Sequence, residues 1–108
     1  MKICFHEKLY SNDISERKLN SIKKKVAGRS PKLNLYLITL PLGNQGILEI
    51  YWYPELLQKV YQKLADDIIV VGVAFDRDTA FELVEQIVSE ASLKGENIPI
   101  KEFFEESR

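Results

Sequence analysis

The strongest pattern along the chain is the apolar run from Ile68 to Phe75, which predicts a strand buried on both faces at the centre of a sheet. An amphipathic segment follows, and it predicts a helix that starts after Asp76 and stops at Gly95. Its apolar positions have helical spacing and are Ala80, Leu83, Val84, Ile87, Val88 and Ala91. These two segments predict the centre of the core.

Three weaker patterns predict further strands. Residues 3–9 alternate loosely between apolar and polar side chains, as a short strand does. Residues 33–40 and 47–53 are β-like runs, and the segment between them is rich in turn-forming residues. We therefore expect these two runs to form a hairpin.

Two more helices are expected. Residues 14–27 predict a basic helix that Ser15 caps and Gly28 ends. Pro54 is a good first residue for a second helix of about three turns, which reaches residue 64. In the tail, Pro99 permits at most an edge strand or a docked loop.

The order of these elements predicts the fold class. Its first six members follow the β-α-β-β-α-β order of the ferredoxin-like motif, with a C-terminal helix after them. We expect an α+β sandwich with a mixed or antiparallel sheet of about four strands and two to three helices. The 108 residues contain no linker or repeat, so residues 1–108 are expected to form a single domain.

Composition restricts the class of protein and its location. Apolar residues make up 45% and charged residues 29%, which is typical of a soluble globular chain. The single cysteine, Cys4, allows no internal disulfide and fits a reducing compartment. The N-terminus lacks the apolar run of a signal peptide, and no apolar run approaches the ~20 residues that span a bilayer. We therefore expect a cytoplasmic protein that does not bind membranes.

The net charge of −1 conceals an uneven distribution. Residues 1–33 contain nine basic and three acidic side chains, a charge of +6, whereas residues 34–108 contain six basic and 13 acidic, a charge of −7. A basic helix can bind phosphate backbones. The candidate polyanion-binding residues are Arg17, Lys18, Lys23, Lys24, Lys25 and Arg29. The alternative is a solvated helix face, or one that docks on the acidic part of this chain or of a second copy.

The densest aromatic cluster, residues 51–53, suggests an interaction surface. Period-two alternation places Trp52 with Leu48 and Ile50, and we expect these three in the core. The opposite face could stack single-stranded RNA, but the RNP1 sequence pattern of RNA-recognition sheets is missing. A helix, the tail or a second copy is the better cover for it. The candidate interaction residues are Tyr51, Tyr53, Phe103 and Phe104.

No motif predicts catalysis or metal binding. Cys4 and His6 share a strand face, but about 7 Å separates their backbones and the chain has no other Cys or His for a zinc site. The glycines at 43 and 46 fit a hairpin turn better than a nucleic-acid clamp. Asp76 is interpreted as the N-cap of the helix that follows it. We predict no catalytic, cofactor-binding or metal-binding residues.

Several segments together resemble a family of small uncharacterised bacterial proteins. They are residues 35–41 and 48–51, and residues 71–74 leading into 82–84, together with residues 8–10 and the basic helix, so they cover most of the chain. The resemblance implies one small bacterial α/β domain with no assigned activity, and it implies no catalytic residue.

The leading functional hypothesis is a non-enzymatic protein-interaction module that self-associates. Several strands are apolar on both faces and few helices are available to cover them, so a second copy or another protein is the expected partner. One alternative is a nucleic-acid-binding protein that uses the basic helix at 17–29. Another is a small enzyme without a recognisable motif.

Overall fold

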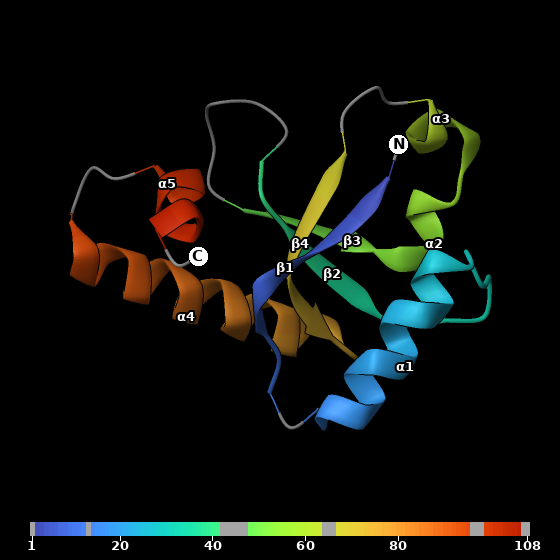
Figure 1. Cartoon of the computed structure of the whole chain (residues 1–108), viewed down its shortest axis with the longest axis horizontal. Coiled ribbons are helices and arrows are strands. Elements are labelled where there is room, and N and C mark those ends of the chain that lie inside the picture. Colours follow the sequence, from blue (N-terminus) through green and yellow to red (C-terminus); the bar gives the residue numbers. More distant parts are fainter. Residues whose placement is uncertain (1, 13, 42–47, 64–66, 96–98, 107–108) are drawn as a thin grey trace.

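A computed structural model describes residues 2–12, 14–41, 48–63, 67–95 and 99–106. The chain forms a four-stranded mixed sheet with helices on both faces (Figure 1). This is the predicted α+β architecture. The strands are β1 (Ile3–Tyr10), β2 (Tyr36–Thr39), β3 (Glu49–Trp52) and β4 (Ile68–Ala74). The helices are α1 (Glu16–Ala27), α2 (Tyr53–Leu56), α3 (Lys59–Gln62), α4 (Arg77–Lys94) and α5 (Ile100–Glu106).

The strand order, which the sequence leaves open, is β1-β4-β2-β3. β4 pairs with β1 in parallel and with β2 in antiparallel orientation, and β2 and β3 form the predicted antiparallel hairpin. Six of the seven residues of β4 are buried, which confirms the prediction of a central strand. Phe75 lies just beyond its end and is exposed.

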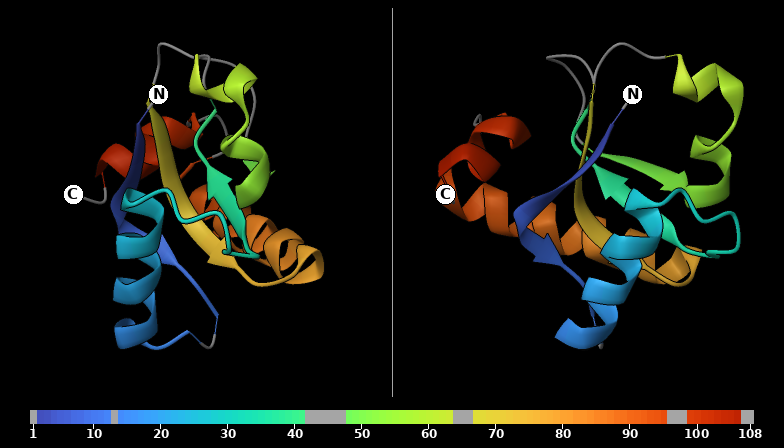
Figure 2. Two further views of the ribbon diagram at one scale, coloured as in Figure 1. Left: turned by 90° about the vertical axis from the view of Figure 1, so that its right-hand side faces the viewer. Right: turned by 45° about the vertical axis from the view of Figure 1, so that its right-hand side comes forward.

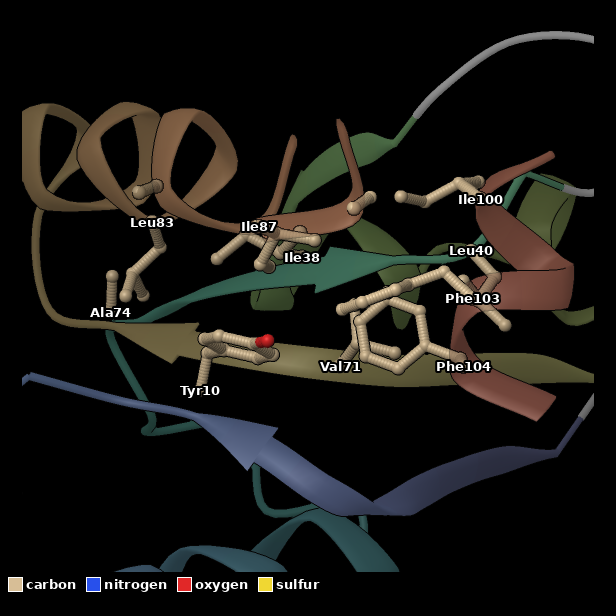
Figure 3. Packing of buried hydrophobic residues seen from close by; sticks show 12 residues of the cluster. Tyr10, Ile38, Leu40, Val71, Ala74, Leu83, Ile87, Ile100, Phe103 and Phe104 are labelled. Atoms are coloured by element: carbon tan, nitrogen blue, oxygen red, sulfur yellow. The ribbon is translucent and has the colours of Figure 1, made fainter. Parts of the chain in front are cut away.

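Each face of the sheet carries its own hydrophobic cluster. On one face, α4 and α5 pack on the sheet through Leu83, Ile87 and Phe104, as Figure 3 shows. On the other face lies α1, as the ribbon views of Figure 2 show. Its Ile22 and Val26 belong to the same buried cluster as Tyr53 and Leu56 of α2. Side chains of β4 enter both clusters, so both faces of this strand are buried. This explains why apolar and polar residues do not alternate along it.

Local capping fixes the ends of the two longer helices as predicted. The Ser15 side chain accepts a hydrogen bond from the Lys18 amide at the start of α1, and Gly28 is the C-cap. Asp76 accepts from the Thr79 amide at the start of α4. Gly95 ends α4 with a φ of 154°, a conformation that favours glycine.

The prediction of a three-turn helix after Pro54 is wrong. The chain instead makes two single turns, α2 and α3, with extended backbone at Gln58 between them. Tertiary contacts explain the break. Tyr53 and Leu56 are fully buried in α2, while the Tyr61 ring meets the Tyr51 ring edge-on at 5.9 Å. The two turns together bring Tyr53, Leu56 and Tyr61 into one hydrophobic cluster with the sheet.

The tail is also different from the prediction, because it forms the helix α5 rather than a strand or loop. The Pro99 carbonyl accepts hydrogen bonds from the amides of Glu102 and Phe103, so the proline stands before the helix, where its missing N–H costs nothing. Ile100, Phe103 and Phe104 have the i, i+3, i+4 spacing of a helix face, and all three are buried.

Candidate functional site

The predicted polyanion-binding residues lie on α1 and at its C-terminal end. Arg17, Lys18, Lys24, Lys25 and Arg29 are exposed, and Lys23 is half-buried. Lys18 and Lys23 each lie over the ring of a different aromatic residue. The Lys18 Nζ lies 5.0 Å from the centre of the Phe75 ring, and the Lys23 Nζ lies 6.0 Å from that of Phe5. The apolar residues Ile22 and Val26 of α1 pack on the core, while most of its basic side chains face solvent.

The four predicted interaction residues do not form one surface. Tyr53, Phe103 and Phe104 are buried in the chain's own cores, and only Tyr51 is half-buried. The two tyrosines belong to the cluster on the α1 face, whereas the two phenylalanines belong to the cluster under α4 and α5. The sheet separates the two pairs.

A different set of residues forms a surface groove, which we call the aromatic groove. Its volume is about 300 Å³. Its lining comes from β2, β3 with the residue before it, α2 and α4: Tyr36, Leu48, Ile50, Trp52, Glu55, Arg77 and Phe81. Trp52 is 44% exposed and Phe81 is 53% exposed, so the expectation of a core position for Trp52 is wrong.

The strand order explains why this groove is open. Trp52 is opposite Tyr36, and Tyr36 is in turn opposite Ala74, so the three lie in one row across the end of the sheet. In this row α4 buries Ala74, but Tyr36 is only half-buried and Trp52 is exposed. A hydrogen bond of 3.0 Å from the Trp52 indole nitrogen to Asn34 Oδ1 holds the exposed ring in place. The ring is therefore presented in a fixed orientation.

The two charged residues of the aromatic groove have opposite signs. Glu55 accepts a hydrogen bond from the Tyr61 hydroxyl at 2.5 Å, which raises the pKa of Tyr61. Arg77 is exposed at the start of α4. Exposed aromatic rings beside an arginine are typical of protein-binding surfaces. This lining provides apolar area and charge complementarity rather than a nucleophile and a base.

A second cleft lies at the carboxyl ends of the parallel strands β1 and β4. From there α1 and α4 run to opposite faces of the sheet, and ligands of open sheets bind at such positions. The cleft has a volume of about 460 Å³ and includes Ser11, Phe75 and Asp76. The Asp76 carboxylate accepts hydrogen bonds from both the amide and the hydroxyl of Thr79, which lower its pKa. Asp76 thus serves as the predicted helix cap.

Cys4 and His6 line a third cavity, of about 350 Å³, beside β1. The His6 Nδ1 accepts a hydrogen bond of 3.0 Å from the Lys8 amide, in the part of β1 where the pairing with β4 is irregular. This nitrogen therefore supports the strand backbone and does not activate the thiol. Within the described residues, no three His, Cys, Asp or Glu side chains are grouped to hold a metal ion.

Among the described residues, no helix combines the length and the apolar character that crossing a bilayer requires.

Comparison with known proteins adds no assignment. No family model, no curated protein and no solved structure matches the chain. The resemblance to small bacterial proteins therefore stays a prediction.

Proposed function

We propose that the chain is a non-enzymatic protein-interaction module that self-associates through the aromatic groove. One observation supports this proposal above all. Trp52 and Phe81 are large apolar side chains from different elements, and they stand exposed around one groove beside an edge strand. Contiguous apolar surface of this kind is usually covered by a partner.

The charges of the groove favour a second copy of the chain as that partner. In a two-fold dimer the same surface patch of both copies forms the interface. An acidic residue on one copy can therefore pair with a basic residue on the other, and the reverse pair forms as well. Glu55 and Arg77 meet this condition. Because the single free cysteine, Cys4, fits a reducing compartment, we place this module in the cytoplasm.

Replacing Trp52 by serine should weaken self-association at least about 30-fold, because buried tryptophans are among the strongest contributors to interfaces. Light scattering over a micromolar concentration series would measure the change. Leu93→Ser is the matched control, since Leu93 is 87% exposed near the far end of α4 and outside the groove. A wild-type chain that stays monomeric throughout would contradict the proposal, as would equal effects of the two substitutions.

The basic helix supports polyanion binding as a second candidate function. Four exposed cations of α1, namely Arg17, Lys18, Lys24 and Lys25, lie within three turns of one helix. Phosphate contacts of this type depend on charge rather than on base sequence, and their affinity falls steeply with salt.

The double substitution Lys24→Glu/Lys25→Glu should abolish binding of single-stranded RNA at low salt, because it changes the charge of α1 by −4. Fluorescence anisotropy at increasing salt would record the wild-type affinity and its slope. Lys94→Glu, at the exposed end of α4 on the other face, should leave binding almost unchanged. The absence of wild-type binding at low salt would rule out this second function.

A further inference from the structure

We propose that two copies pair along β3, antiparallel about a two-fold axis at Ile50, so that the two four-stranded sheets become one continuous sheet. This inference rests on the proposed self-association and specifies its geometry. The backbone of β3, its side chains and the other edge of the sheet each support it.

The backbone of β3 has hydrogen-bonding groups that face away from β2. The Tyr53 amide donates to the Leu35 carbonyl across the hairpin at 2.9 Å, so this residue points its polar groups toward β2. In an antiparallel pair the direction alternates along the strand. Glu49 and Tyr51 therefore also bond to β2, while the N–H and C=O of Ile50 face the outer edge.

The outer edge of β3 is open, whereas the other edge of the sheet is protected. No described strand pairs with β3 on that side, and none of its four residues is buried. At the opposite edge, the pairing of β1 shifts register between Phe5 and Tyr10, and Glu7 is exposed there. Irregular pairing and charge are common devices that prevent edge-to-edge association. β3 is thus the better edge for a second copy.

An axis at Ile50 gives a self-complementary register of side chains. It places Leu48 opposite the partner's Trp52, an apolar cross-strand pair that joins the two aromatic grooves on one face. On the other face it places Glu49 opposite the partner's Tyr51. The Tyr51 hydroxyl already donates to Glu49 Oε2 within one chain at 2.6 Å, so the same bond can form across the axis.

Disulfide trapping tests this geometry in the full chain with Cys4→Ser as background. At the axis, the two Ile50 Cα atoms would lie about 5.5 Å apart, within the range of a disulfide. We expect Ile50→Cys to form a covalent dimer on mild oxidation with diamide. Leu48→Cys should not, because its Cα would lie about 14 Å from its counterpart.

Two further variants keep the test decisive if Ile50→Cys associates poorly. Ile50→Pro removes an N–H that faces only the outer edge, so the β2–β3 bonds survive. Ile50→Thr shortens the side chain but keeps the N–H. We expect the proline variant to be monomeric under conditions in which the threonine variant still dimerises, with equal helix and strand content by circular dichroism.

The outcomes separate this geometry from the proposed function. A wild-type chain that never dimerises contradicts both. A wild-type dimer in which Leu48→Cys cross-links as readily as Ile50→Cys, or in which Ile50→Pro dimerises as well as Ile50→Thr, overturns the β3 pairing. Self-association through the groove would then stand without it.

Discussion

Replacing Phe104 by alanine should destabilise the protein by about 3–5 kcal/mol, the usual cost of truncating a buried aromatic residue. Phe104 is 1% exposed, and its ring meets those of His6, Tyr10 and Phe103 edge-on. Such a loss is a large part of the roughly 5–15 kcal/mol that stabilises a typical domain. Urea unfolding followed by circular dichroism would measure it.

The same substitution should release α5 before the rest of the fold. A helix of seven residues is too short to persist without tertiary packing. Hydrogen exchange should therefore show faster exchange of the α5 amides than of the β4 amides. Leu93→Ala, at a highly exposed position, should change stability by less than about 0.5 kcal/mol. If both variants unfolded at the same urea concentration, α5 would not be part of the core.

Patterns that depend on local chemistry made β4 and α4 predictable. Each of these elements has a pattern of its own that predicts which residues are buried. In β4 it is the apolar run at 68–75, and in α4 it is the helical spacing from Ala80 to Ala91. The caps at Ser15 and Asp76 depend on residues three positions away. For α5 the residues Ile100, Phe103 and Phe104 have helical spacing, but the proline at 99 by itself allows an edge strand or a docked loop as well as a helix start.

Features that depend on strand order could not be predicted. The break between α2 and α3 coincides with the contact of Tyr61 with Tyr51, which belongs to another element. The aromatic groove likewise combines Tyr36, Trp52 and Phe81, which are far apart in sequence. The period-two alternation along β3 correctly predicts that Trp52 and Ile50 point to the same face of the sheet. Which of these two side chains stays exposed depends on how far α4 covers that face, and the sequence does not show this.

Alkaline pH should destabilise the fold, and Tyr10 should account for a measurable part of the loss. Burial, followed by the negative charge of Glu90, raises the pKa of Tyr10 from 10.0 to about 12. Burial also raises the pKa values of Tyr51 and Tyr53. Above pH 10 the unfolded chain therefore loses these protons first, and the free energy of unfolding falls as the pH rises.

For Tyr10 alone, the stabilisation is complete below pH 10 and is lost as the pH approaches 12. A difference of about two pKa units corresponds to roughly 3 kcal/mol, because each unit is worth about 1.4 kcal/mol. Tyr10→Phe removes this titration, so its stability should fall less steeply than that of the wild type over the same interval. Urea unfolding at a series of pH values would compare the two slopes. If the free energy of unfolding fell equally steeply with pH in both proteins, the pKa of Tyr10 would be the same in the folded and unfolded chains. Burial beside Glu90 would then not raise this pKa.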